Sequence, residues 1–279
     1  MLPDLMLDAA FLARRYKQAH GRYPNLLRPG TFNERIVHRN LFDRSPLLAQ
    51  FADKLAVRSY VESRVGSAPL PELYWVTTHP SDIPFGTLPQ RYVVKPTHGS
   101  GWVRLVSDGS RLDREDLVAT CEDWLKQSYY KKTRERIYRD VVPRILVEEF
   151  ISSNSGSVPE DYKLYVFGGQ VVMIEMMIGR FQSLRSKLFD KLWREIDVSI
   201  LGCEHAPDDR FERPKLLEEM VAMAETLGRG IDFVRVDLYQ TENKVYFGEL
   251  TASPGAGLER FNPLSFDRFL GKLWQSAAS

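Results

Sequence analysis

The chain has 279 residues, of which 43% are hydrophobic and 27% are charged. This length and composition allow a substantial core and exclude a disordered tail, a collagen and a disulfide-stabilised mini-protein. Lys and Arg together number 38 and Asp and Glu 37, so the formal net charge of +1 gives no reason to expect a general binder of nucleic acids or polyanions. Any binding function must therefore lie in a local site.

Cysteine usage and the N-terminal sequence favour a reduced, cytoplasmic setting. The two cysteines, Cys121 and Cys203, lie in no CxxC or Cys/His cluster, which argues against a zinc site and against a disulfide framework. Residues 1–20 mix apolar with charged side chains and lack the apolar core and cleavage site of a signal peptide. No segment approaches the roughly 20 apolar residues that a membrane-spanning helix needs. We therefore expect a cytoplasmic protein with no membrane insertion.

Hydrophobic periodicity predicts helices first and then a mixture of strands and helices. Up to about residue 66 the chain is expected to be helical, with one helix near the N-terminus and a second that follows the N-cap residue Ser45 and runs through Val61. Further along the chain, the spacing predicts strands over 73–78, 92–95 and 102–106, a helix over 113–130, strands over 145–150, 162–167 and 171–177, a helix over 215–227, a hairpin of strands 233–239 and 244–250, and a final helix that includes residues 266–273.

The segment from Val93 to Gly101 places a lysine and glycines where a strand ends in a turn of small residues. Gly99 and Gly101 allow backbone amides to approach an anion closely, and Lys95 adds a charge-assisted donor beside them. This arrangement suits a phosphate group, although the segment matches neither the P-loop nor the GxGxxG pattern. An ordinary β-turn next to a solvated lysine is the alternative interpretation.

The predicted hairpin near the C-terminus carries two acidic residues that should face each other. Strand alternation places Arg235 and Asp237 on one face, and folding at the turn brings Glu249 opposite Asp237. Two facing carboxylates repel unless a cation or a proton lies between them, and Mg²⁺ accepts one or two carboxylates together with substrate phosphates. In the alternative interpretation, Asp237 pairs with Arg235 alone and Glu249 faces water.

The strand over 145–150 ends at two consecutive acids, Glu148 and Glu149. Such a strand end can offer backbone groups to an adenine edge and a carboxylate to its amino group or to a ribose hydroxyl. By themselves, these acids indicate little more than a solvated strand end.

Residues 126–144 form a basic segment that also contains tyrosines. It holds seven Lys or Arg residues against two acids, and three tyrosines lie between them. The segment suits an acidic glycan or a nucleotide-linked uronic acid, with sugar rings stacked on the tyrosines. A solvated helical arm is the equally weighted alternative, and any binding of an anionic polymer should weaken as salt rises.

The order of these motifs resembles the ATP-grasp superfamily over residues 53–257. The matching motifs are Asp53-Lys54-Leu55, the Val-Lys-Pro strand with its Gly-rich turn, the Val-Glu-Glu-Phe strand, and the Arg-Val-Asp…Glu-Leu-Thr-Ala-Ser-Pro-Gly hairpin. The hairpin is also similar to that of the D-alanine–D-alanine ligases, which ends in Ser-Pro-Gly. Five motifs are similar to those of the TupA-like branch, which is associated with bacterial surface-polysaccharide biosynthesis. They are Phe32-Asn33-Glu34-Arg35, Leu41-Phe42-Asp43-Arg44, the Lys-Pro-Thr-His-Gly-Ser-Gly turn, Asp161-Tyr162-Lys163 and Phe247-Gly248-Glu249-Leu250.

This resemblance implies an α/β (α+β) ATP-grasp fold, in which two α+β subdomains clamp ATP after a helical N-terminal segment. We expect a helical segment over 1–50, the N-terminal α/β part of the ATP-grasp core over 51–90, the lid subdomain over 91–147, and a C-terminal subdomain with the metal and acceptor site over 148–279. Because the first 50 residues are expected to be helical, the complete N-terminal α/β domain of many ATP-grasp ligases is not expected here.

The resemblance also implies which residues contact the nucleotide. Lys54 and Lys95 would contact the α- and β-phosphates of ATP, and Lys163 would be a further nucleotide contact. The remaining nucleotide contacts would be the flap residues His98, Gly99, Ser100 and Gly101, and the adenine-binding residues Glu148, Glu149, Phe150 and Ile151. A role for His98 as an acceptor-side base is the less favoured alternative, because a histidine in a turn is more often a solvated contact.

The metal, catalytic and acceptor residues follow from the same resemblance. Asp237 and Glu249 would ligate Mg²⁺, while Arg235 and Lys95 would stabilise charge during the transfer. Thr251 stands where the family has Asn, and its hydroxyl is a poorer ligand, so a second metal site is in doubt. The acceptor pocket would be lined by the loop 253–257, with Ser253, Pro254 and Gly255 as the expected contacts.

The implied activity is an ATP-dependent carboxylate–amine ligase that forms an amide through an acyl phosphate and releases ADP and phosphate. Its partners would be an amine or amino acid and a carboxylate donor, such as a uronic acid of a glycan or sugar nucleotide, with no nucleic acid. A phosphotransferase that needs no amine and a non-catalytic nucleotide- or glycan-binding module are the alternatives. Asp237→Asn is expected to abolish turnover and leave the fold nearly unchanged.

Overall fold

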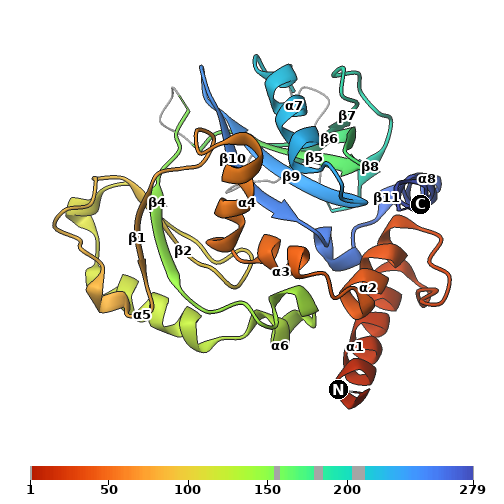
Figure 1. Ribbon diagram of the computed structural model, residues 1–279, viewed down its shortest axis with the longest axis horizontal. Helices are drawn as coiled ribbons and strands as arrows, with labels where there is room; N and C mark the ends of the chain where they lie inside the picture. The colour runs from red at the N-terminus through yellow and green to blue at the C-terminus, as the bar shows by residue number, and fades with distance from the viewer. Residues whose placement is uncertain (1, 154–157, 179–184, 203–210, 279) are drawn as a thin grey trace. The chain divides into compact units, whose positions relative to one another are not determined.

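The computed structural model describes residues 2–153, 158–178, 185–202 and 211–278 (Figure 1). The chain divides into two compact units: unit 1 joins residues 1–44 and 159–279, and unit 2 comprises residues 45–158. Within the described ranges, no helix is both long and apolar enough to cross a membrane. The four segments expected from the ATP-grasp resemblance stay a prediction. Contacts within the chain place the N-terminal helices in one compact unit with the C-terminal part of the chain.

Unit 2 is built on a four-stranded antiparallel sheet with the strand order β1–β4–β2–β3. Its core lies between this sheet and one helix, where Val94 and Val147 pack with Leu117 and Cys121. The strands are β1 (Leu73–Thr77), β2 (Tyr92–Pro96), β3 (Arg104–Val106) and β4 (Ile145–Glu149). The helices are α3 (Pro46–Ala52), α4 (Ala56–Val65), α5 (Arg114–Lys126) and α6 (Tyr129–Thr133), with short 3-10 turns η1 (Pro80–Asp82), η2 (Gly109–Arg111) and η3 (Arg136–Tyr138).

Two of the helices expected from the sequence are interrupted. The helix expected over 45–61 is wrong as a single element: α3 ends at Ala52, and α4 begins at Ala56. The Asp53 carboxylate accepts hydrogen bonds from the backbone N–H groups of Leu55 at 2.8 Å and Ala56 at 3.2 Å. Short acidic side chains compete in this way with the helical hydrogen bonds. Likewise, the helix expected over 113–130 is divided into α5 and α6.

Unit 1 is built on a five-stranded antiparallel sheet with the strand order β10–β9–β5–β6–β7 (Figure 1). The strands are β5 (Asp161–Phe167), β6 (Gln170–Ile178), β7 (Arg185–Phe189), β9 (Phe233–Gln240) and β10 (Val245–Thr251), and a separate pair joins β8 (Ser199–Ile200) to β11 (Phe261–Asn262). The helices are α1 (Leu2–His20), α2 (Phe32–Phe42), α7 (Leu217–Leu227) and α8 (Ser265–Ala277), with a 3-10 turn η4 (Pro254–Gly257). Strands β7, β8 and β11 were not predicted from the sequence.

One face of the unit 1 sheet carries charged side chains at one end and aromatic side chains at the other. Because side chains alternate along a strand, the odd-numbered residues of β5 and β9 share this face. The charged residues are Asp161, Lys163, Arg235 and Asp237, and the aromatic residues are Tyr165, Phe167 and Phe233. Helices α2 and α8 cover the aromatic end, where the Phe233 ring lies 4.9 Å from Phe32 and 4.6 Å from Trp274 between centroids. Helix α7 packs on the opposite face, where Gly228 lies against Val166.

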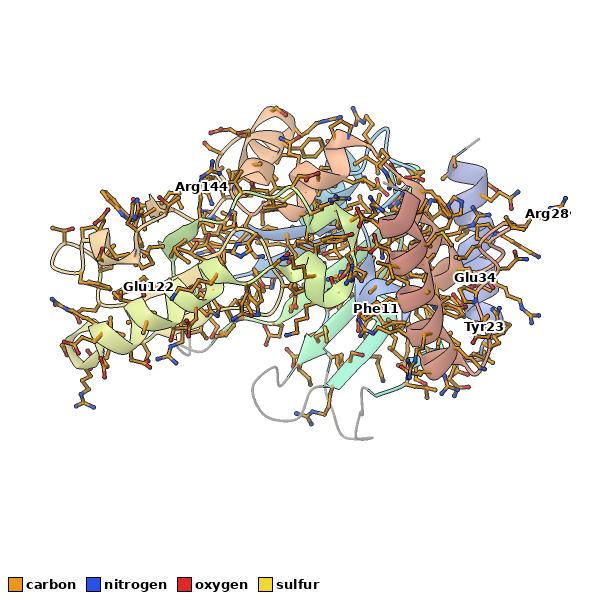
Figure 2. The ribbon with its side chains drawn as sticks, turned by 90° about the horizontal axis from the view of Figure 1, so that it is seen from below. Phe11, Tyr23, Arg28, Glu34, Glu122 and Arg144 are labelled. Atoms are coloured by element: carbon orange, nitrogen blue, oxygen red, sulfur yellow. The ribbon has the colours of Figure 1, made fainter. Side chains whose placement is uncertain are left out.

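The Phe32-Asn33-Glu34-Arg35 motif begins helix α2 with a capping box. The Thr31 hydroxyl accepts from the Glu34 backbone N–H at 3.2 Å, and the Glu34 carboxylate accepts from the Thr31 N–H at 3.2 Å. Glu34 lies in the first turn of α2 (Figure 2), where it also accepts from Arg22 at 2.5 Å and from the Asn25 N–H at 3.0 Å, both in the segment that joins α1 to α2. This acid therefore fixes the α1–α2 connection.

Candidate functional site

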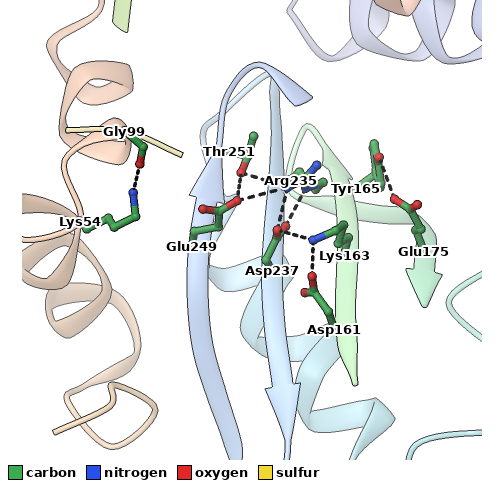
Figure 3. Close-up of polar contacts among 10 residues, drawn as sticks. All are labelled: Lys54, Gly99, Asp161, Lys163, Tyr165, Glu175, Arg235, Asp237, Glu249 and Thr251. Carbon is green, nitrogen blue, oxygen red and sulfur yellow. Dashed lines mark hydrogen bonds and ion pairs between the residues drawn. The ribbon is translucent and has the colours of Figure 1, made fainter. Parts of the chain in front are cut away.

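The facing carboxylates predicted for the hairpin are register partners in β9 and β10 (Figure 3). The Arg235 guanidinium lies between them: its Nε and Nη2 each donate to Asp237 at 2.7 Å, and Nη2 also donates to Glu249 at 3.3 Å. Glu249 is partly exposed, at 38% of its side chain, yet it contacts Arg235 rather than facing water alone. Thr251 completes the group, since its hydroxyl donates to Glu249 at 2.9 Å and accepts from Arg235 at 3.3 Å.

Lys163 joins the same cluster from the neighbouring strand β5. Its ammonium group donates to Asp161 at 2.5 Å and to Asp237 at 2.9 Å (Figure 3). Asp237 therefore accepts hydrogen bonds from two cations while its side chain is almost completely buried. The strand order β10–β9–β5 places these groups together, although Lys163 and Asp237 are far apart in the sequence.

Ion pairing keeps this cluster charged in spite of its burial. Burial by itself raises the pKa of Asp237, but Arg235 and Lys163 outweigh it and lower the pKa to about 2. Burial lowers the pKa of Lys163, and the carboxylates of Asp237 and Asp161 raise it above its ordinary value. Near neutral pH the buried Asp237 is therefore ionised and is paired with two cations, Arg235 and Lys163.

Two further carboxylates belong to this polar face and were missed from the sequence. Burial and the neighbouring Glu259 raise the pKa of Glu175 to about 7, and burial also raises the pKa of Glu259. The Tyr165 hydroxyl donates to Glu175 at 3.3 Å (Figure 3). Glu175 had a usable signal, because it is the one acid in a strand whose other residues after Gln170 are all apolar. Glu259 had none, since it follows an irregular loop.

The loop predicted to line the acceptor pocket follows β10 directly. Ser253 and Pro254 are buried, and Gly255 is exposed. A Cβ atom on Gly255 would lie 2.5 Å from Cγ of Glu259, so the loop passes directly over this acid. The predicted acceptor residues thus lie next to the Glu259 carboxylate, which interacts electrostatically with Arg235 and Lys163.

In unit 2, the predicted phosphate residues lie around the Gly-rich turn. The Lys54 ammonium donates to the backbone carbonyl of Gly99 (Figure 3). Lys95 forms an ion pair with Glu148, which also lies 3.9 Å from Arg58. Lys54 and Gly99 are thus brought together, and so are Lys95 and Glu148, each within this unit.

The other residues predicted to bind the nucleotide lie along the same sheet. Their contacts are a hydrogen bond from the Glu72 N–H to the Glu149 carboxylate at 3.1 Å, and an Arg91 guanidinium 4.2 Å above the Phe150 ring. Ile151 is partly buried, Ser100 is exposed, and Gly101 has a φ of +76°. Arg58 and Glu72 also line a cavity of about 420 Å³ beside α4.

His98 is turned toward helix α5. Its buried ring lies 3.0 Å from the Trp124 carbonyl and 3.2 Å from that of Gln127, both measured from Nε2. Burial lowers the pKa of His98, so the ring is neutral near pH 7. In this arrangement the imidazole binds the carbonyl end of α5, and the predicted role in nucleotide binding stays a prediction.

The basic segment 126–144 presents charged and aromatic side chains together. Arg134 and Arg139 both lie over the Tyr130 ring, at 5.8 and 5.6 Å from its centroid. Tyr129 and Tyr138 contact each other edge to face at 4.6 Å.

Of the two cysteines, Cys121 is a buried free thiol whose pKa burial raises to about 12, and Cys203 lies outside the described residues.

The donor set of the hairpin fits a hard divalent cation bound together with a phosphate substrate. Among the described residues, no group of three or more His, Cys, Asp or Glu side chains forms a complete metal site. Mg²⁺ needs only one or two carboxylates when substrate phosphates and water supply the other oxygens. Asp237, Glu249 and Thr251 all direct oxygen atoms to the single Nη2 of Arg235, which shows that this arrangement can surround one positive charge.

Comparisons with known structures and curated proteins give the following similarities. One is the ATP-grasp ligase PsnB complexed with minimal precursor (15% identity, 84% of this chain and 63% of that chain, TM-score 0.45). A second is a D-alanine–D-alanine ligase from Bacillus anthracis complexed with ATP (17% identity, 76% of this chain and 57% of that chain, TM-score 0.45). A third is an L-amino acid ligase from Bacillus licheniformis (19% identity, 81% of this chain and 50% of that chain, TM-score 0.47). The chain thus spans between 50% and 63% of the length of these proteins. No curated protein matches the chain.

A family model described as TupA-like ATP-grasp matches residues 34–275. The match contains the Gly-rich turn, the acidic strand end and the hairpin on which the resemblance was recognised. It covers most of the chain and both compact units. The chain therefore belongs to the TupA-like ATP-grasp family and has the mixed α+β fold of that superfamily.

Proposed function

We propose that this protein is an ATP-dependent ligase that joins a carboxylate to an amine, with Mg²⁺ as the metal and ADP and phosphate as products. The observation that carries the proposal is the pairing of Asp237 with Glu249 around Arg235, with Lys163 beside them. A purely structural hairpin has no need for two facing carboxylates, because their mutual repulsion destabilises the strand pair. Family membership supports the same activity.

The residues of unit 1 would serve the transfer of the γ-phosphoryl group. Asp237 and Glu249 would hold Mg²⁺, which supplies neutralisation of phosphate charge when bound. Arg235 is oriented by its two hydrogen bonds to Asp237, so its guanidinium is preorganised to stabilise negative charge that develops on the substrate. Lys163 balances the remaining charge of Asp237.

The residues of unit 2 would bind the nucleotide. Lys54 and Lys95 would contact phosphate oxygens, and the backbone from Gly99 to Gly101 would cover them. The end of β4, from Glu148 onward, would contact adenine and ribose. Lys95 now pairs with Glu148, so nucleotide binding would exchange this ion pair for contacts with ATP.

The proposed reaction has two steps. A carboxylate oxygen of the donor attacks the γ-phosphorus of ATP, the bond between that phosphorus and the β–γ bridging oxygen breaks, and ADP leaves. The amine nitrogen then attacks the acyl carbon, phosphate leaves with the donor oxygen, and the nitrogen loses a proton. Exclusion of water protects the acyl phosphate from hydrolysis in the interval.

We propose a uronic acid of a bacterial glycan precursor as the carboxylate donor, and the cytoplasm, where ATP is available, as the place of reaction. The basic segment 126–144 supports an acidic saccharide, because arginines and tyrosines gather there in unit 2. The acceptor would be an amino acid or another small amine, received by the loop that begins at Ser253.

The test is product analysis of the purified protein with Mg²⁺, ATP, a panel of amino acids and amines, and uronic acids including D-glucuronic acid. ADP that appears only with both substrates, and a product lighter by one water than their sum, is the expected result. ADP formed without an amine, together with a phosphorylated product, would establish a phosphotransferase instead, and AMP would exclude the acyl phosphate. Asp237→Asn should remove activity, whereas the control Glu242→Gln, at the exposed turn of the same hairpin, should retain it.

A further inference from the structure

The loop 252–259, which follows the hairpin, has a left-handed backbone at three consecutive residues, one of which is an alanine. Gly255 and Ala256 both have a φ of +54°, and Gly257 has a φ of +76°. The left-handed region is unfavourable for alanine, and such conformations persist only where surrounding contacts enforce them. The contacts that enforce this loop therefore determine its shape.

Those contacts come from the N-terminal helices α1 and α2. The His20 imidazole lies 3.0 Å from the Gly257 carbonyl oxygen, and because a carbonyl only accepts, Nε2 carries the proton. The Asn33 amide donates to the Glu259 carbonyl at 2.8 Å. The Arg39 guanidinium donates to the Ala252 carbonyl at 3.2 Å.

These three side chains are themselves fixed. The His20 ring stacks on Tyr16 at 4.1 Å between centroids. Asn33 donates to the buried Asp267 at 3.0 Å, and Arg39 is 4% exposed and lies 4.3 Å above the Trp274 ring. Side chains that are already ordered lose little conformational entropy when they contact the loop, so they hold it more firmly than mobile side chains would.

The loop also fits directly against the backbone of α2. A Cβ atom on Gly257 would lie 2.7 Å from the Asn33 carbonyl oxygen and 3.0 Å from a methyl carbon of Val37. Glycine is thus needed at this position both for its φ and for the close approach. The start and the end of the loop are therefore fixed by residues more than 200 positions earlier in the chain.

We infer that residues 1–44 form a functional part of the acceptor site, in which His20, Asn33 and Arg39 are positioning residues that hold loop 252–259 in the shape that receives the amine. This inference rests on the proposed ligase function for the identity of the acceptor. Its structural part, the control of the loop by the N-terminal helices, can be measured without any substrate.

The test compares His20→Ala with His20→Gln, because a glutamine amide can still donate a hydrogen bond to the Gly257 carbonyl. The backbone N–H groups of Ala256 and Leu258, which donate within the loop at 3.0 Å, report its opening by hydrogen exchange. Loss of one neutral hydrogen bond should raise their exchange rates about 3- to 10-fold in His20→Ala, with recovery in His20→Gln. His38→Ala is the matched control, since it also removes a histidine that lies against an aromatic ring, 4.8 Å from Phe42 between centroids, but one that makes no hydrogen bond to the loop.

The activity readout separates this inference from the proposed function. With D-glucuronic acid and the amino-acid panel, the KM for the amine should rise about 3- to 10-fold in His20→Ala and recover in His20→Gln, while affinity for Mg²⁺ and AMPPNP stays unchanged. Equal exchange in wild type and His20→Ala, or altered exchange with an unchanged KM, would overturn the inference. A wild-type protein without ligase activity would refute the proposed function, and the exchange rates would still decide the positioning. If His20→Ala does not fold, His20→Asn, whose amide stops short of the carbonyl, replaces it.

Discussion

Replacing Asp237 by Asn tests whether a buried charge network holds Arg235 and Lys163 in place. The sequence alone led us to expect a nearly unchanged fold for this variant. The structure instead shows that Asp237, at 2% exposure, accepts charged hydrogen bonds from Arg235 and Lys163. Asparagine would keep one acceptor oxygen and turn an NH₂ group toward a cation. Two buried cations would then lack part of their compensating charge.

The size of the effect follows from the pKa and from the burial of Asp237. Lowering its pKa from 3.8 to about 2 corresponds to about 2 kcal/mol in favour of the ionised folded state. Removing one partner from a buried ion pair costs about 3–5 kcal/mol. We therefore expect Asp237→Asn to lower the free energy of unfolding by about 2–5 kcal/mol.

The assay is urea unfolding at pH 7 without nucleotide, followed by tryptophan fluorescence. Glu249→Gln is the matched control, because it makes the same chemical change on the same face at a side chain that is 38% exposed. Its single 3.3 Å contact with Arg235 should be worth less than about 1 kcal/mol. Equal losses in the two variants would refute the account of the buried network.

The stabilisation by Asp237 should also depend on pH in a defined direction. Because the folded-state pKa is lowered, the contribution is fully present above about pH 4. It is lost progressively as the pH falls toward 2, where the folded protein also takes up the proton. The difference in stability between wild type and Asp237→Asn should therefore shrink over this interval, and a constant difference would contradict the assigned shift.

Two further substitutions test other parts of the structure of unit 1. Burial and Glu259 raise the pKa of Glu175 from 4.5 to about 7, so the stability of the wild type should fall as the pH rises through this interval. Glu175→Gln should remove that loss. In urea unfolding between pH 4.5 and 7.5, the stability of this variant relative to wild type should therefore rise by up to about 3 kcal/mol. Gly271→Ala would place a Cβ atom 2.6 Å from the Gly30 carbonyl oxygen and should lower the unfolding free energy by about 1–3 kcal/mol, whereas Gly86→Ala, with no atom within 4 Å, should stay within about 0.5 kcal/mol.

The parts of the site that were predictable depend on local periodicity. The alternation of side chains along β9 and β10 was sufficient to place Glu249 opposite Asp237, and the register confirms it. The strand periodicity likewise located β2 and β4, which contain Lys95 and Glu148. A break in the helix at Asp53 was missed, because it arises from a side chain that competes for backbone hydrogen bonds in an otherwise helical pattern.

The parts that were not predictable depend on contacts between distant segments. Glu259 joins the polar face only because the loop before it turns back over the sheet, and nothing in its local sequence indicates this. Asn33 was recognised as part of a family motif, yet its bond to the Glu259 carbonyl spans 226 residues. The ion pair between Lys95 and Glu148 depends on the neighbouring positions of two antiparallel strands, which single-strand patterns do not specify.

The most direct test of the central claim follows one oxygen atom through the reaction. A uronic acid labelled with ¹⁸O in its carboxyl group is incubated with the protein, Mg²⁺, ATP and the amine, and the released phosphate is analysed by mass. If the carboxylate attacks ATP and the amine then displaces phosphate, one labelled oxygen must appear in the phosphate. Unlabelled phosphate formed together with the amide would contradict the acyl phosphate and, with it, the proposed ligase mechanism.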